Sequence, residues 1–180
     1  LDPNGQPQVQ VRTITYDRSK YVDKFESLFK NELGCLKGYE HHIRLRTNSI
    51  PKTSKVRRIP VYLHQQVETE LENLLNQDII EAVEATQWLA PLVVSCKSGG
   101  GVRLCVDLRE LNKDVIVDHF PLPCIDELMN NLDNAKVFTT LDLTSAYYQV
   151  ELDEASQELT SFITPFGSYQ FKRLPFGLVS

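Results

Sequence analysis

The feature that most limits the possible fold is a series of short apolar runs separated by tight-turn residues. Runs of this kind, rich in β-branched and aromatic residues and joined by three to five turn residues, pair as antiparallel hairpins. Two hairpins are expected, the first joining 92–94 to 102–108 and the second joining 159–164 to 169–172. Other runs expected to be extended are 42–45, 137–143 and 147–152.

Helical patterns occur between these runs. The clearest covers residues 64–77, where one face carries Val67, Leu71, Leu74 and Leu75. Two further helices are expected, one at 21–29 and one after Pro123 with Ile125, Leu128, Met129 and Leu132 on its apolar face and Asp133-Asn134 as its stop. Residues 48–60 are expected to be an extended basic loop. Helices mixed with hairpins predict an α+β fold with a mostly antiparallel sheet.

Charge is unevenly distributed along a chain whose net charge is −5. Cations crowd one stretch that holds a single acid, Glu40, and they are Lys37, Arg44, Arg46, Lys52, Lys55, Arg57 and Arg58. The acids gather later, at Glu68, Glu70, Glu72, Asp78, Glu81 and Glu84. The basic stretch could bind a polyanion such as a nucleic acid, or it could be an ordinary solvated surface.

The four cysteines show no metal-binding spacing. They are scattered, with no CxxC pair and no histidine at ligand distance, and they are Cys35, Cys96, Cys105 and Cys124. We expect four free thiols and an intracellular protein, in a cytoplasmic particle or in the nucleus. No apolar run approaches the roughly 18–20 residues that a membrane span needs, so no membrane partner is expected.

Asp142 is the first candidate for chemistry. It ends an otherwise apolar, β-rich run, where an ionised carboxylate is costly unless a cation or hydrogen bonds compensate for lost hydration. A carboxylate in such a place can hold Mg²⁺, which prefers oxygen ligands. The alternative is that Asp142 caps the turn before Thr144 and Ser145. Tyr147 and Tyr148 follow, and taken alone such aromatics are more often core residues.

A glycine-rich turn provides the second candidate. Gly99, Gly100 and Gly101 allow backbone N–H groups to face an anion, and Lys97 and Arg103 flank them. The turn lacks the pattern of a P-loop, and many glycine hairpin turns bind nothing. Nearby, the alternating charges of residues 107–110 favour a structural ion pair between Asp107 and Arg109.

The third candidate is the segment FITPFGSYQFKRLPFGL, in which aromatic residues are interleaved with Lys172 and Arg173. Aromatic rings beside cations suit the bases and phosphates of nucleic acids, although a hairpin with one apolar face gives the same pattern. The residues Leu174-Pro175-Phe176-Gly177 predict a sharp turn.

In this order, the segments resemble the reverse transcriptase of gypsy-type long-terminal-repeat retrotransposons, the Metaviridae. The resemblance begins at LGCLKGYEHHIRL and continues through VRRIPVYLHQQVETELENLLNQDIIEAVEATQWLAPLVVSCKSGGGVRLCVDLRELNK. It then covers FPLPCIDELMNNLDNAKVFTTLDLTSAYYQVEL and ends at FKRLPFGLVS. With the residues just before its first motif, the resemblance spans about residues 25–180.

The resemblance implies the fingers and the first part of the palm of a right-hand polymerase. Its implied divisions are a connector after a protease at 1–24, a segment leading into the polymerase at 25–54, fingers at 55–117 and partial palm at 118–180. The implied activity is RNA-directed DNA polymerisation, a metal-dependent nucleotidyl transfer from a dNTP to a primer 3′-OH. The implied partners are an RNA/DNA template-primer, the dNTP, and the rest of the polyprotein.

The resemblance also assigns roles to individual residues. Asp142 matches the first catalytic aspartate, and with the backbone carbonyl of Leu143 it would hold Mg²⁺ or Mn²⁺. The implied nucleotide-binding residues are Lys97 and Arg103 for the triphosphate, Tyr147 as the gate that rejects a ribose 2′-OH, and Phe176 in the pocket lining. Cations in a position to contact nucleic acid are Arg57, Arg58, Lys172 and Arg173.

The chain departs from the family pattern in three respects. Ser145 stands where retroviral relatives often have a second acid, and Thr144-Ser145-Ala146 replaces a frequent R/H-S-G. The paired aspartates of the YxDD hairpin, the thumb and RNase H are expected beyond residue 180, so the chain alone is expected to be inactive.

Two other readings remain open: a non-catalytic or domesticated nucleic-acid-binding module derived from a retroelement, and an RNA-dependent RNA polymerase. An intact YxDD downstream would favour the enzyme over the module, and nucleotide choice would separate the two polymerases.

Overall fold

The computed structural model describes residues 19–30, 32–84, 86–97, 99–119, 121–132, 135–138 and 140–179. The chain divides into two compact units, residues 1–32 and 33–180. In the first unit, the predicted helix at 21–29 is present in part. Helix α1 (Ser19–Lys24) is followed by the 3₁₀ turn η1 (Glu26–Leu28). Most of the implied connector at 1–24 and the predicted helix stop at 133–134 lie outside the described residues.

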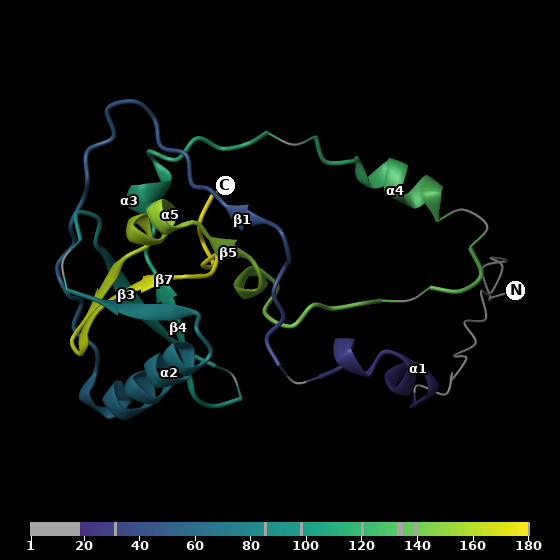
Figure 1. Cartoon of the computed structure of the whole chain (residues 1–180), viewed down its shortest axis with the longest axis horizontal. Coiled ribbons are helices and arrows are strands. Elements are labelled where there is room, and N and C mark those ends of the chain that lie inside the picture. The colour runs from purple at the N-terminus through teal and green to yellow at the C-terminus, as the bar shows by residue number, and fades with distance from the viewer. Residues whose placement is uncertain are drawn as a thin grey trace, which may run out of the picture. The chain divides into compact units, whose positions relative to one another are not determined.

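The second unit is built on a five-stranded sheet of order β2-β7-β6-β3-β4 (Figure 1). Its strands are β2 (Ile80–Val83), β3 (Ala90–Cys96), β4 (Val102–Val106), β6 (Phe162–Thr164) and β7 (Gly167–Phe171). Both predicted hairpins are present, since β3 pairs with β4 and β6 pairs with β7, in each case antiparallel, but residues 107–108 and 159–161, which were predicted to be extended, lie outside the strands. A parallel pairing of β3 with β6 joins the hairpins, and β2 adds antiparallel to β7. The sheet is therefore mostly antiparallel, as predicted.

Helix α2 (His64–Asn76) confirms the helix predicted at 64–77, and the 3₁₀ turn η2 (Val61–Leu63) precedes it. Its buried residues are Val67, Leu71 and Leu74, and the helix packs against β4. Asp78 then adopts a left-handed backbone conformation (φ 55°), which lets the chain reverse directly into β2. Strand β2 was not predicted.

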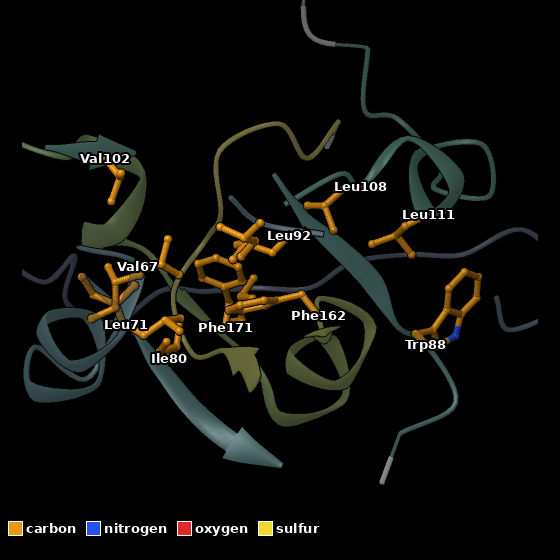
Figure 2. Close-up of a cluster of buried hydrophobic side chains, with 14 of the residues drawn as sticks. Val67, Leu71, Ile80, Trp88, Leu92, Val102, Leu108, Leu111, Phe162 and Phe171 are labelled. Carbon is orange, nitrogen blue, oxygen red and sulfur yellow. The ribbon is translucent and has the colours of Figure 1, made fainter. Parts of the chain in front are cut away.

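The core joins the sheet to α2 and to the short helix α3 (Arg109–Asn112). Phe162 and Phe171 pack with their ring centroids 5.2 Å apart, and Figure 2 shows them beside Leu92. Val67, Leu71 and Ile80 lie at one end of this cluster, and Trp88 and Leu111 at the other (Figure 2). Burial of these side chains is the main force that holds the second unit together.

A small second sheet pairs β1 (Glu40–His41) in parallel with β5 (Glu151–Leu152). The strand predicted at 42–45 was placed too late in the chain. Residues 42–45 do not form a strand ladder. The Ile43 N–H donates a hydrogen bond to Ser156 Oγ (2.7 Å), and Leu45 makes only an isolated bridge with Val115. Ser156 belongs to helix α5 (Glu154–Leu159), which was not predicted. Asp153 caps this helix by accepting a hydrogen bond from the Ser156 N–H (3.2 Å).

Helix α4 (Ile125–Asn131) confirms the helix predicted after Pro123, but its apolar face is exposed. The strand predicted at 137–143 was wrong, since the described residues of this run form no ladder. A strand needs a neighbour to satisfy its backbone groups, and no described residues supply one. The apolar side chains of this run are accordingly exposed, and they are Val137, Phe138, Leu141 and Leu143.

The extended run predicted at 147–152 was right only at its end. Residues Ala146–Gln149 form the 3₁₀ turn η3, and the chain becomes extended at β5. The reason is Ser145, whose left-handed conformation (φ 50°) starts a tight turn in which the Tyr148 N–H donates to the Ser145 carbonyl (2.9 Å). Among the described residues, no helix is long and apolar enough to cross a membrane.

Candidate nucleotide-binding site

Two predicted nucleotide-binding residues meet in an aromatic cluster. The rings of Tyr147 and Phe176 lie 4.9 Å apart between centroids, and the Tyr148 ring contacts Phe176 edge-on at 5.2 Å. Tyr147 and Phe176 are 50% and 49% exposed. Each ring is therefore held by its neighbours and still offers surface to a ligand.

The backbone brings these rings together from separate segments. Tyr147 lies on η3, and Phe176 lies in the turn that follows β7. Hydrogen bonds align the two stretches, because the Leu152 N–H donates to the Lys172 carbonyl and the Leu174 N–H to the Val150 carbonyl (each 2.9 Å). Gly177 then turns the chain with a φ of +89°, a conformation that favours glycine. The sharp turn predicted at 174–177 is thus present.

The two predicted phosphate-binding cations flank the β3–β4 hairpin. Lys97 follows β3, and Arg103 on β4 pairs in register with Ser95. Lys97 Nζ lies 3.4 Å from Glu70 Oε1 on α2. An open pocket of about 430 Å³ lies here, lined by Tyr62, Gln65, Gln66, Thr69, Glu70, Lys97, Gly101 and Val102.

Electrostatics connect the hairpin cations to the aromatic cluster. Burial raises the pKa of the Tyr148 hydroxyl to about 12, the negative charges of Cys105 and Glu70 add to this effect, and Arg103 opposes it. Arg103 and Glu70 are therefore close enough to Tyr148 for their charges to act on it. Glu70 also pairs with Lys97, and Tyr148 contacts Phe176, so the link between the hairpin cations and the rings of Tyr147 and Phe176 is indirect and runs through Glu70 and Tyr148.

The predicted metal-binding residues, Asp142 and Leu143, lie in an irregular, exposed segment. In the described part of the chain, no side chain or backbone group hydrogen-bonds or ion-pairs with the Asp142 carboxylate. A carboxylate and a carbonyl suit Mg²⁺ in their chemistry. However, the described residues contain no group of three or more His, Cys, Asp or Glu side chains that could hold a metal ion. Asp142 and Leu143 therefore do not form a metal site by themselves among the described residues.

Three of the four cations predicted to contact nucleic acid have carboxylate partners. Arg57 pairs with Asp107 (2.7 Å), Lys172 with Asp78 (2.5 Å), and Arg173 with Glu151 (3.4 Å). Arg58 has no carboxylate partner among the described residues, and it lines an open pocket of about 370 Å³ with Val56, Arg57, Ile59, His64 and Pro165.

Asp107 is the centre of an ionic cluster. Besides Arg57, it accepts hydrogen bonds from Nε and Nη2 of Arg109 (both 2.7 Å), so the predicted structural pair is confirmed. The hydrogen bonds from Arg109 hold the pKa of the Asp107 carboxyl far below its usual range, and Arg57 lowers it further. Two more cations of the basic stretch are paired, Arg44 with Asp118 and Lys52 with Asp114. The carboxylates of Asp107, Asp114 and Asp118 therefore neutralise part of the positive charge of the basic stretch.

Two polar residues of this neighbourhood were missed in the sequence. Glu70 was listed only as one of the acids that follow the basic stretch, although its position next to Leu71 places it at the edge of the buried face of α2. Asn112 carried no signal, because its partners, Gly177 and Val179, are far away in the chain. All four cysteines are free, as predicted.

Comparison with known proteins identifies relatives of the chain. Residues 96–180 match the family described as reverse transcriptase (RNA-dependent DNA polymerase). The Pol polyprotein of transposon 412 from Drosophila melanogaster is 36% identical over 170 residues, which cover 89% of this chain and 13% of the relative. The Pol polyprotein of the Drosophila melanogaster transposon gypsy is 42% identical over 118 residues, covering 62% of this chain and 11% of the relative. The chain thus spans about an eighth of the length of these relatives.

Solved structures share the fold. The protease–reverse transcriptase of prototype foamy virus matches with a TM-score of 0.77 at 22% identity, over 89% of this chain and 22% of the viral one. A foamy viral protease–reverse transcriptase in complex with an RNA/DNA hybrid matches equally well, with a TM-score of 0.77 over 90% of this chain and 22% of the other. At this level of identity, the likeness establishes the α+β fold.

Proposed function

We propose that this chain, whose residues 96–180 belong to the reverse transcriptase family of retrotransposon Pol polyproteins, forms the nucleotide-binding part of an RNA-directed DNA polymerase. The observation that carries this proposal is the half-exposed pair of rings, Tyr147 and Phe176, together with Tyr148, on which the charges of Arg103 and of the Lys97 partner Glu70 act. Cations suit the triphosphate of a nucleotide, and a half-exposed pair of rings suits its sugar. The 42% identity to the gypsy polyprotein supports a gypsy-type element.

Each side chain has a role in this proposal. Lys97 and Arg103 bind the triphosphate, while Tyr147 lies beneath the sugar and Phe176 fixes the position of the Tyr147 ring. A ribose 2′-OH would meet the Tyr147 ring, so the pocket selects dNTPs. Glu70 is the counter-ion that Lys97 leaves when a triphosphate arrives, because the more highly charged anion binds the ammonium group more strongly.

Asp142 and the Leu143 carbonyl would hold Mg²⁺ or Mn²⁺ together with carboxylates supplied by the rest of the polymerase. The ion would lower the pKa of the primer hydroxyl and stabilise the leaving pyrophosphate. The exposure of Asp142 fits this role, since its carboxylate is free of any partner among the described residues that would compete for it.

The wider assignment follows the same resemblance. Residues 55–117 would be fingers and 118–180 the start of the palm, preceded by 25–54 and a connector at 1–24. A template-primer would be the partner of Arg57, Arg58 and Lys172, whereas the predicted contact of Arg173 is not supported, because its side chain is 13% exposed and pairs with Glu151. The complex of a foamy viral relative with an RNA/DNA hybrid supports such a partner. The four free thiols support an intracellular location.

Nucleotide selection tests the proposal. In a polymerase that contains this chain, primer extension should prefer dNTPs over rNTPs, and Tyr147→Ala should reduce this preference by about tenfold or more, as expected when a group that discriminates by contact is removed. Tyr39→Ala is the matched control, because Tyr39 is also half-exposed (51%) and lies just before strand β1 of the small sheet. Equal effects of the two substitutions would contradict the assigned role of Tyr147.

One observation favours a second function, a nucleic-acid-binding module without catalysis. Arg58 has no carboxylate partner among the described residues and lines an open pocket. If the parent polypeptide bound a labelled template-primer but added no nucleotide in Mg²⁺ or Mn²⁺, this second function would replace the first.

A further inference from the structure

We propose that Asn112 is a positioning residue for the nucleotide pocket, because its side-chain amide fixes the turn that carries Phe176. The inference rests on the proposed function for its consequence, although the contact itself is independent of that function. Asn112 is the last residue of α3 and lies 64 positions before Phe176 in the chain.

Both ends of the Asn112 amide bond to the backbone of the turn. Its Nδ2 donates to the Gly177 carbonyl at 2.8 Å, and its Oδ1 accepts from the Val179 N–H at 3.2 Å. An asparagine amide has a donor and an acceptor on one rigid plane, so the two bonds fix the position and the orientation of residues 177–179 together. No other side chain of similar size offers both groups in this geometry.

The Asn112 contact adds to the packing of the turn, in which Pro175 is fully buried and Leu178 packs against the core, because few backbone hydrogen bonds hold the turn itself. Strand β7 ends at Phe171, and the last ladder-like bond is the one from the Leu174 N–H to the Val150 carbonyl. Beyond this bond, the chain reverses at Gly177 (φ +89°). Glycine adopts many backbone conformations with similar ease, so Gly177 does not by itself hold the turn in one conformation. Side-chain bonds to backbone groups commonly stabilise turns of this kind.

The anchor of the contact is rigid. Helix α3 is held by Leu108 and Leu111, which are 2% and 4% exposed in the main core. The Asn112 N–H also donates to the Leu108 carbonyl at 2.8 Å. A continuous set of contacts therefore runs from the core through Asn112 and Gly177 to Phe176, and from Phe176 to the ring of Tyr147.

Loss of the amide should therefore move the Phe176 and Tyr147 rings as well as loosen the turn. Sugar discrimination depends on where those rings stand, and displacements of about 1 Å can change rates by large factors. A residue that only stabilised the fold would lower the amount of folded protein and leave the nucleotide preference of the folded fraction unchanged. Nucleotide preference thus separates positioning from stability.

The test uses a polymerase containing this chain and three variants. Asn112→Ala removes both bonds, and Asn112→Asp keeps the acceptor for Val179 but loses the donor to Gly177. Asn76→Ala is the matched control, because Asn76 is likewise the last residue of its helix and is exposed. Hydrogen exchange of the peptide spanning 174–179 reports the turn, and the ratio of kcat/KM for a dNTP and its rNTP reports the pocket.

We expect exchange in this peptide to be about tenfold faster in Asn112→Ala, as for a backbone amide that loses its partner, with a smaller increase in Asn112→Asp. The dNTP-over-rNTP ratio should fall in the same order, by about tenfold for Asn112→Ala. Asn76→Ala should change neither quantity. If Asn112→Ala does not fold, Asn112→Asp decides the question.

Three results would overturn the inference in distinguishable ways. Unchanged exchange in both Asn112 variants would mean that the amide does not hold the turn. Faster exchange with an unchanged nucleotide ratio would mean that the contact serves stability alone. If the parent polymerase incorporates no nucleotide, both the proposed function and the positioning role of Asn112 are wrong. The hydrogen-exchange data would still show whether the Asn112 amide holds the turn.

Discussion

The ionic cluster at Asp107 gives the most quantitative prediction, for the variant Asp107→Asn. The Asp107 side chain is 11% exposed, and it joins Arg57, 50 residues earlier, to Arg109. A hydrogen bond to a charged group contributes about 1.5–3 kcal/mol, but the two arginines are 47% and 79% exposed, which weakens their pairing. We therefore expect Asp107→Asn to lower the free energy of unfolding by about 2 kcal/mol.

Urea denaturation of the 180-residue chain measures this loss, with the fluorescence of the single, buried Trp88 as the signal. For a denaturant slope of about 2 kcal/mol per molar, the midpoint should fall by about 1 M. Glu110→Gln is the matched control, because the exposed Glu110 pairs with Lys113 at the surface and its loss should not measurably move the midpoint.

The pH dependence of the difference follows from the pKa of Asp107. Because the folded state holds this pKa far below its ordinary value, the ion pairs add stability at any pH above the unfolded pKa of about 3.9. This added stability is lost as the pH falls below that value. The parent and Asp107→Asn should therefore differ most at pH 7 and converge in acid. Equal midpoints for Asp107→Asn and Glu110→Gln at pH 7, or a difference that grows in acid, would refute the reasoning.

Four further predictions follow from the same structure. Phe162→Ala should cost about 3–5 kcal/mol of unfolding free energy in urea, because Phe162 is 1% exposed, whereas Phe138→Ala at a 66% exposed site should cost far less. Asp153→Ala should cost about 1 kcal/mol in thermal melting by removing the cap of α5, and an unchanged melt would contradict that role. Glu70→Gln should lower the KM for a dNTP several-fold in steady-state kinetics of a polymerase containing the chain, by freeing Lys97, and a raised KM would contradict the counter-ion role. The 180-residue chain alone should add no nucleotide to a primer, since the described residues lack a metal-binding group of acids, and any extension would contradict this prediction.

Features of the fold that depend on local pattern were predictable. The two hairpins and α2 follow from apolar spacing and turn residues within short windows. Strand β2 was missed because it begins two residues after the helical turn residue Asp78, so that its apolar residues continue the pattern of α2. Helix α5 was missed because its sequence, EASQEL, has little apolar periodicity. Its buried residue is Ser156, whose hydroxyl oxygen accepts a hydrogen bond from the N–H of the distant Ile43.

The run 137–143 shows the opposite limit of sequence patterns. Its β-branched and aromatic residues predict a strand, but a strand also requires a neighbour, and local sequence does not say whether one is present. The parallel pairing of β3 with β6 was unpredictable for the same reason, because its partners lie about 70 residues apart.

For the candidate nucleotide-binding site, the sequence predicted which residue types take part and their order along the chain, but not their partners. A glycine turn with flanking cations and a Tyr-Tyr pair could be read directly from the sequence, and in the structure Tyr147 contacts Phe176 while the charge of Arg103 acts on Tyr148. The partners that modify these residues come from elsewhere in the chain. Glu70 pairs with Lys97, which lies 27 residues later in the chain, and Asp107 pairs with Arg57, which lies 50 residues earlier. Such pairings depend on tertiary structure, which local spacing does not encode.

The rate of nucleotide addition by Asp142→Asn tests the central claim most directly. It should be measured by primer extension with a polymerase containing this chain, beside Asp126→Asn, a matched change at an exposed aspartate on α4. We expect Asp142→Asn to abolish synthesis while its melting curve stays that of the parent, and Asp126→Asn to retain the parent rate. Synthesis by Asp142→Asn within about tenfold of the parent would contradict a metal-binding role for this carboxylate.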